Sequence, residues 1–449
     1  MSVDLIHNKI ENNKEEYIEF LRELIRINSY NPPGNENDVA LKIIDYLKPD
    51  GIKCKVFPFG ENRANLIAFL NDNFNDKNLL YNGHMDVVPP GSEEEWKYPP
   101  LSAIIKRKKI LYGRGSADMK SGVAAMVIAL KILKILNIKL SGNLILNIVA
   151  DEETGGIFGT KWCLDNKLNS IKCDFSIVGE ATDFKPLSKA ILLGEKGRVQ
   201  LKIVTNGISC HASAPFLGKN AIYMMSDIIQ NLVKLHDRVP KVSPPISLNK
   251  LKKLVSASFP NKENFERVYN EQPLLSNVMK ALTQFTYSVT MINAGIKENV
   301  VPGRCEAKID FRLLPGQNVD IIINEIKKII QELGYHIKNT PIGGPEEIYV
   351  YLEIEQQSEA SYWKEWENSQ TLKELYDIVE KVYNQKPFYF LLPASADANF
   401  LRNTNYCPQT VIFGPGVAAS AHTVDEHVEI QDFLNAIKVF TLFAYKFLK

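Results

Sequence analysis

Residues 143–156, NLILNIVADEETGG, decide the fold because they join a buried strand to a cluster of acids. The apolar run 143–150 is typical of a central strand that is covered on both faces of a sheet. Asp151, Glu152 and Glu153 follow directly. Paired carboxylates and Thr-Gly-Gly at a strand end favour a functional site over a solvated loop. Two neighbouring glutamates can divide the work, one binding a metal and the other accepting a proton from the attacking water.

The segments around this strand repeat the pattern of strand, polar cluster and helix. Such an alternation predicts an open α/β sheet with helices on both faces and a site at the carboxyl ends of its strands. From residue 372 a helix, a short strand near 409–413 and a final helix bring the chain back to this domain. The expected strands are 53–59, 65–70, 78–83, 143–150 and 174–180, and the expected helices are 8–27, 37–49 and 121–137.

The middle third of the chain has a different order of elements. We expect strands at 196–207, 283–295, 305–314 and 347–355 and helices at 220–236 and 319–333. The order βαββαβ predicts a ferredoxin-like α+β lid over residues 191–360, inserted in a mixed-sheet catalytic domain formed by 1–190 and 361–449. The stretch 238–280 is too long for an ordinary connection, so we expect an insertion in the lid with helices of its own.

Bulk properties are those of an ordinary soluble protein. The 449 residues favour two domains, and the net charge of +1 gives no electrostatic basis for binding nucleic acid. Six cysteines without CxxC spacing predict neither a disulfide framework nor a thiolate zinc site. The first residues read as an amphipathic helix rather than a signal peptide, and no apolar run reaches membrane-spanning length. We therefore expect a cytoplasmic location.

Histidines and acids also follow the other predicted strands and loops. They are His84 and Asp86 in GHMDVVPPG, Asp118 in GRGSADMKSG, Glu180 in VGEATD and His422 in AHTVDEH. With Glu153 they provide five ligands and spare carboxylates, which suits a hydrolase with two metals. Asp86 stands two positions after His84, where it can orient the imidazole. Asp118 has an alternative role as the N-cap of the next helix, and the other histidines are assigned to surface or core.

Together these motifs resemble the series found in the dinuclear zinc aminoacylase and carboxypeptidase family. That family includes acetylornithine deacetylase, succinyl-diaminopimelate desuccinylase, glutamate carboxypeptidase and carnosine-type dipeptidases. The resemblance extends from about residue 10 to the C-terminus. It implies that His84 and Glu180 hold one metal, that Glu153 and His422 hold the other, and that Asp118 bridges the two. It also implies that Asp86 orients His84 and that Glu152 is the general base.

The resemblance implies further roles for residues of the lid. His211 in GISCHASAP would stabilise the oxyanion, often in the active site of the neighbouring subunit of a homodimer. Asn299 would bind the substrate's oxygen, and Arg312 would bind its carboxylate. Without the resemblance, His211 reads as a loop residue and Arg312 as an exposed strand position. The segment 414–416, GPG, either presents backbone donors to a substrate carboxylate or forms a plain turn. The insertion leaves open which subunit supplies His211.

The expected function is hydrolysis of the amide bond of an N-acyl amino acid, of the deacetylase or desuccinylase type. The segment around Asp397 resembles that branch of the family. A di- or carboxypeptidase acting on short peptides is the alternative, followed by a non-catalytic peptide-binding protein and a dinuclear phosphoesterase. Zinc suits a shell of histidine and carboxylate ligands, and the same ligands accept cobalt or manganese.

Overall fold

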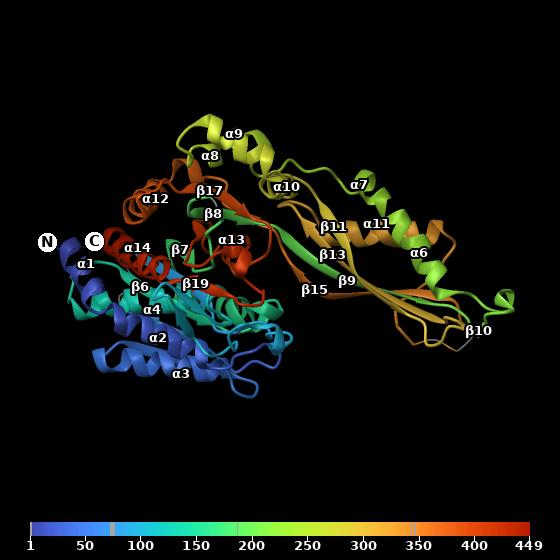
Figure 1. The fold of residues 1–449 in the computed structure, drawn as a ribbon, viewed down its shortest axis with the longest axis horizontal. Helices are drawn as coiled ribbons and strands as arrows, with labels where there is room; N and C mark the ends of the chain where they lie inside the picture. The colour runs from blue at the N-terminus through green and yellow to red at the C-terminus, as the bar shows by residue number, and fades with distance from the viewer. Residues whose placement is uncertain (1, 72–76, 186, 343, 345–346) are drawn as a thin grey trace.

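The computed structural model describes residues 2–71, 77–185, 187–342, 344 and 347–449. It consists of two bodies, one holding both chain termini and the other a long, narrow lid (Figure 1). Within the described residues the first body contains a nine-stranded mixed sheet in the order β1-β2-β6-β3-β7-β18-β8-β16, with β17 paired to β8. These strands are β1 (Lys53–Phe59), β2 (Arg63–Phe69), β3 (Asn78–His84), β6 (Asn143–Val149), β7 (Phe175–Val178), β8 (Ala190–Glu195), β16 (Ser361–Tyr362), β17 (Phe388–Leu392) and β18 (Thr410–Ile412).

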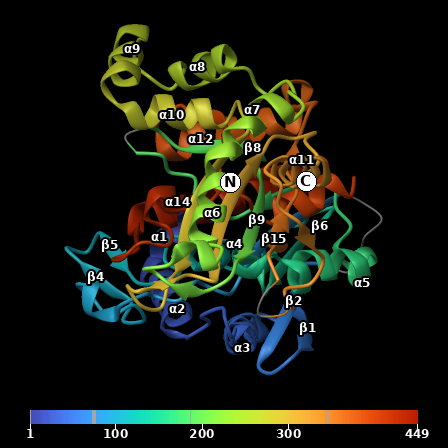
Figure 2. The same ribbon diagram turned by 90° about the vertical axis from the view of Figure 1, so that its right-hand side faces the viewer.

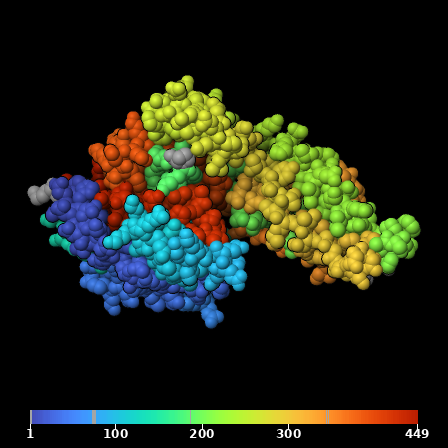
Figure 3. Space-filling view, viewed as in Figure 1, coloured from blue at the N-terminus to red at the C-terminus, as the bar shows by residue number. Residues whose placement is uncertain are grey.

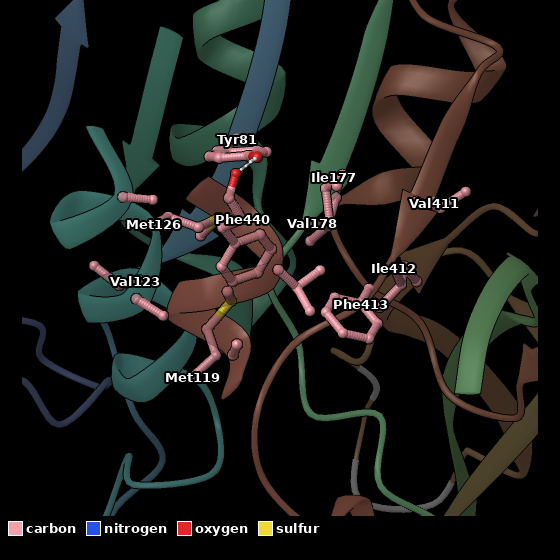
Figure 4. Close-up of a cluster of buried hydrophobic side chains, with 14 of the residues drawn as sticks. Tyr81, Met119, Val123, Met126, Ile177, Val178, Val411, Ile412, Phe413 and Phe440 are labelled. Carbon is pink, nitrogen blue, oxygen red and sulfur yellow. Dashed lines mark hydrogen bonds between the residues drawn. The ribbon is translucent and has the colours of Figure 1, made fainter. Parts of the chain in front are cut away.

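Helices cover both faces of this sheet, as neighbouring residues of β3 show. The Tyr81 hydroxyl donates to the carbonyl of Phe440 in α14, on the face that α4 also covers (Figure 4). Asn82 points to the other face and donates to Thr160, next to α5. The helices of this body are α1 (Ser2–Asn12), α2 (Lys14–Arg26), α3 (Glu36–Leu47), α4 (Lys120–Ile135), α5 (Trp162–Ile171), α12 (Gln370–Tyr383), α13 (Ala398–Asn403) and α14 (Ile430–Leu448).

Helix α4 is buried almost all round, which explains its continuous apolar sequence. It packs against α14 and the strand β3. Gly122 permits a close approach, since a Cβ at this position would lie 1.9 Å from the carbonyl oxygen of Gly179. The helix is therefore fixed directly beside the strand end that carries Glu180.

The lid has the predicted ferredoxin-like order of elements. Its sheet, five-stranded over the described residues, runs β11-β13-β9-β15-β14, and its four long strands are antiparallel. Apolar residues of α6 and α11, spaced three and four apart, form the lid core against one face of this sheet. The elements are β9 (Gly197–Asn206), α6 (Ala221–Asn231), α7 (Leu235–Arg238), β11 (Thr286–Ala294), β13 (Arg304–Leu313), α11 (Val319–Glu332), β14 (Ile337–Lys338) and β15 (Tyr349–Ser358).

The insertion 238–280 packs on the first body and not on the lid, where we expected it. It forms the helices α8 (Leu248–Ser256), α9 (Lys262–Glu271) and α10 (Pro273–Ala281). Their apolar side chains, among them Leu251, Phe265 and Met279, belong to the core cluster of the first body and not to the lid core. Figure 2 shows these helices beside α12, and Figure 3 shows them reaching toward the lid. The sequence predicted the helices but not their partner, because an amphipathic helix does not specify which apolar surface it covers.

The structure therefore confirms the predicted fold class, while the domain boundaries stay a prediction. Some short elements had no clear periodicity in the sequence and were not predicted. They include β8, β17 and the sheet of β4 (Ile104–Lys106), β5 (Ile110–Tyr112) and β19 (His427–Glu429). In the part of the chain that is described, no helix combines the length and hydropathy needed to cross a membrane.

Candidate metal centre

Three parallel strands bring the predicted site residues to one edge of the sheet. The strands β6, β3 and β7 are adjacent and parallel. Their carboxyl ends deliver Glu152 and Glu153, His84, and Glu180, respectively. Asp118 comes from the loop before α4 and His422 from the loop before β19, so residues distant in sequence meet at this edge.

One group of donor atoms forms around His84. Its Nε2 atom lies 3.1 Å from Oδ1 of Asp118 and 3.4 Å from Oε1 of Glu180. The ligand atoms of these three residues all lie within 4.8 Å of one another, which fits a single cation. Nδ1 of His84 lies 2.9 Å from the backbone oxygen of Asp86. Donation from Nδ1 leaves Nε2 free to act as the ligand atom.

A second group forms around His422 and shares Asp118. The Nε2 atom of His422 lies 3.1 Å from Oδ2 of Asp118 and 3.1 Å from Oε2 of Glu153. These three residues also place their ligand atoms within 4.8 Å of one another. Each oxygen of Asp118 thus faces a different histidine. The N-cap alternative for Asp118 is wrong, because Met119 occupies the N-cap of α4.

The electrostatics of the site favour the binding of cations. Burial, with the nearby Asp118, raises the pKa of Glu180 to about 8. Burial also raises the pKa of Glu152 well above its ordinary value, with Glu153 and Glu180 adding to the shift. Hydrogen bonds with Asp118 and Glu153 raise the pKa of His422 to about 11. Buried carboxylates outnumber the two histidines, and such an excess of negative charge is suited to divalent cations.

Asp86 contacts more of the site than the predicted partner His84. Its carboxylate is fully buried and accepts the backbone N–H groups of Glu152 at 3.3 Å and Glu153 at 3.1 Å. Asn31 donates to the same carboxylate at 2.8 Å. The nearest contact of Asp86 with the His84 ring is made by the backbone oxygen, while its Oδ1 lies at 3.5 Å. Asp86 therefore fixes the glutamate pair as well as the histidine.

Glu426 is a site residue that the sequence analysis missed. It belongs to AHTVDEH, four residues after His422, and is fully buried. Its carboxylate accepts the backbone N–H of Asp118 at 2.9 Å and that of Ala117 at 2.7 Å, and it pairs with Arg114 at 2.6 Å. Glu426 thus ties the Asp118 loop to the His422 loop. The sequence signal that could have indicated Glu426 was the presence of two acids, Asp425 and Glu426, within five residues of His422.

A cleft of about 370 Å³ opens above the donor groups. Asp118, Glu152, Glu153, Glu180 and His422 form its floor. The wall on the lid side contains Arg312, for which a substrate-binding role is predicted, and also Arg198, which was not among the predicted site residues. The two arginines are paired across β13 and β9, and both contact the carboxylate of Asp310. One acid for two cations leaves an excess of positive charge on this wall.

His211 and Asn299 do not line this cleft. They lie together at the far tip of the lid, where β10 (Cys210–His211) pairs with β12 (Val300–Val301) and the carbonyl of Asn299 accepts from Ala212 (Figure 1). His211 is exposed and contacts Ser213. Within one chain the structure therefore places two of the three predicted lid residues apart from the metal ligands.

The GPG segment does not present free backbone donors to the cleft. The N–H of Gly414 donates to the Thr182 hydroxyl, the N–H of Gly416 donates to Asp432, and Pro415 has no N–H. Of the two alternatives for this segment, these contacts favour the plain turn, because both N–H groups are used to pack the loop.

Comparisons with known proteins agree with this arrangement. Over 431 residues the chain is 27% identical to succinyl-diaminopimelate desuccinylase of Pelagibacter ubique, covering 94% of this chain and 97% of that protein. A solved M20 family metallo-carboxypeptidase of Sulfolobus solfataricus matches with a TM-score of 0.78 at 24% identity, over 96% of this chain and 99% of that one. Human carnosine dipeptidase 1 matches with a TM-score of 0.77 at 15% identity, over 100% and 99%.

The likeness to the two solved structures shows a shared fold. The family described as peptidase family M20/M25/M40 matches residues 80–446, which include every predicted metal ligand. Because this match spans well over half of the chain, the protein belongs to peptidase family M20/M25/M40 and is a hydrolase of amide or peptide bonds.

Proposed function

We propose that this protein is a two-metal hydrolase that removes the acyl group of an N-acyl amino acid. The observation that supports it most directly is the pair of donor groups that share Asp118 on the floor of the cleft. His84 and Glu180 would hold one cation, and Glu153 and His422 the other. When bound, the cations, for which zinc is proposed, would supply a nucleophile from water at neutral pH and polarise the scissile carbonyl.

Glu152 is the proposed general base. It lines the cleft, belongs to neither donor group, and its Oε2 lies 3.8 Å from Nε2 of His84. Its backbone N–H is held by Asp86, which keeps the residue beside the ligands. Glu152 would take a proton from the attacking water and deliver it to the leaving amine.

The cationic wall supports a substrate that carries a free carboxylate. Arg198 and Arg312 face the cleft from the lid, and the planar guanidinium group binds a carboxylate through two parallel hydrogen bonds. The desuccinylase of Pelagibacter ubique, by its name, removes a succinyl group from a diamino dicarboxylic acid. We therefore favour acyl amino acids, with N-succinyl compounds first, as the substrate class.

A peptidase is the second candidate, because the solved relatives are a metallo-carboxypeptidase and a dipeptidase. A free C-terminal carboxylate would satisfy the same arginines. The deacylase and the peptidase differ in which amide bond enters the cleft, so they are distinguished by substrate and not by the metal ligands.

Metal analysis combined with a substrate panel tests the proposal. The purified protein is assayed with N-succinyl amino acids, N-acetyl amino acids and dipeptides, before and after chelation. We expect about two metals per chain and cleavage that stops on chelation and returns with added zinc. Preference for dipeptides would establish the peptidase, and absence of both metal and turnover would overturn the proposal.

A homodimer formed through the lid is also proposed. Apolar residues are exposed at the lid tip near His211, including Phe216, Leu217 and Ile296. A partner lid covering them would allow His211 to reach the other active site, where it would stabilise the oxyanion while Asn299 binds the substrate's oxygen. The cytoplasmic location stays a prediction.

A further inference from the structure

Lys196 stands where the chain passes from the catalytic sheet to the lid. It lies between β8 and β9, and its side chain is buried. The ammonium donates to the carbonyl oxygens of Ala281 and Gln284, both at 2.7 Å, and to the hydroxyl of Thr286 at 3.2 Å. An ammonium has three protons to donate, so these bonds satisfy it completely.

The three acceptors belong to the insertion and to the lid. Ala281 is the last residue of α10, where a positive charge is favoured by the helix dipole. Helix α10 is anchored in the core of the first body through Leu275 and Met279. Thr286 is the first residue of β11 in the lid. Lys196 therefore connects the catalytic sheet, the inserted helices and the lid at a single point.

The strand register places this point directly beside the cationic wall. Arg198 is paired with Arg312, and Arg312 is paired with Thr286 on its other side. The Lys196 side chain thus reaches from the start of β9, past the end of β13, to the start of β11. It binds together the corner of the lid sheet from which both arginines extend into the cleft.

We propose that Lys196 is a positioning residue that holds Arg198 and Arg312 at a fixed distance from the metal centre, with the inserted helices as its second anchor. The chain crosses between the two bodies near residues 195–197 and 358–361, and the insertion adds further connections near 239–247 and 282–286. Lys196 ties the crossing at 195–197 to the connection at 282–286. The inference rests on the proposed function for the role of the arginines.

The test compares Lys196→Met, which keeps most of the length of the side chain but loses its donors, with Lys196→Arg and with Lys250→Met. Lys250 is the matched control, because it lies in the insertion and pairs with Glu367 on the surface. Hydrogen–deuterium exchange is measured for residues 196–200 and 281–288, and succinate binding is measured by calorimetry. Neither measurement requires turnover, so failure of the proposed function on the substrate panel is seen separately.

In Lys196→Met we expect amide exchange in these two segments to accelerate by about tenfold or more, because the corner opens locally. Succinate should bind about tenfold more weakly, and KM for a carboxylate-bearing substrate should rise similarly while kcat changes by less than about threefold. Lys196→Arg should recover most of the affinity, and Lys250→Met should match the unaltered protein.

Unchanged exchange, or faster exchange with unchanged succinate affinity and KM, would overturn the proposal. A fall in kcat as large as the rise in KM in Lys196→Met would also count against the proposal, because a general structural defect would be the simpler cause. If Lys196→Met does not fold, Thr286→Val removes one acceptor only. That variant should show the same pattern with a change of about twofold, and wild-type behaviour would reject the proposed tie.

Discussion

The floor and the lid-side wall of the cleft are built by different means. On the floor, Asp86 and Glu426 are fully buried and fix the ligands through backbone N–H groups. On the wall, the side chains of Arg198 and Arg312 are 31% and 27% exposed and stand on a separate sheet. A preorganised floor suits a chemical step, while a wall on a separate body suits substrate binding. Changes on the floor should therefore alter kcat or metal affinity, and changes on the wall should alter KM.

The largest expected effect is that of Glu152→Gln. We expect kcat to fall by about 10³-fold, because the amide cannot accept a proton from the attacking water. Metal content should not change, since Glu152 belongs to neither donor group. Elemental analysis and initial rates on the same preparation check both statements. Glu94→Gln, an exposed acid, serves as the control. Full activity with both metals retained would disprove the assigned role.

His211→Ala tests whether a residue from the neighbouring subunit completes the active site. We expect kcat to fall by about 10²-fold, the effect typical of losing one oxyanion donor. Mixing His211→Ala with Glu152→Gln after dissociation and reassembly should restore about a quarter of the wild-type rate, because half of the dimers then contain one intact site. Absence of recovery, with mixed dimers demonstrated, would show that His211 does not act across the subunit boundary.

Glu426→Gln tests how the floor is held together. We expect the affinity for divalent metal to fall by about 10- to 100-fold, because the charged acceptor for the Asp118 loop is lost. Competition with a chelator, well below the unfolding temperature, measures this change. Glu429→Gln is the control, since Glu429 is on the neighbouring strand β19 but pairs with Lys185 at the surface. Equal affinities in the two variants would show that Glu426 does not support the site.

The floor was more predictable from the sequence than the wall, for a physical reason. Parallel strands bring their carboxyl ends together, so acids after 143–149 and 175–178 had to meet at one edge. Glu426 was missed because a buried acid that accepts backbone N–H groups looks like a surface acid in sequence. Arg198 was missed because an arginine on an alternating strand has no distinctive pattern. The packing of the insertion on the first body depends on tertiary contacts that periodicity does not encode.

The smallest expected effect concerns the wall. Arg198→Ala and Arg312→Ala should each raise KM for a carboxylate-bearing substrate by about tenfold, which corresponds to one hydrogen bond with a charged group. The values of kcat should change little, because neither side chain belongs to the donor groups. Lys202→Ala, on the same strand but paired with Glu353, should behave like the wild type.

The double variant gives the sharper result, because both arginines contact the same acid, Asp310. After one arginine is lost, Asp310 neutralises the other, and the remaining wall attracts an anion only weakly. The loss in the double variant should therefore be smaller than the sum of the two single losses, expressed as free energies. Additive losses would show that the arginines bind independently, and a large fall in kcat would place the wall in the chemical step.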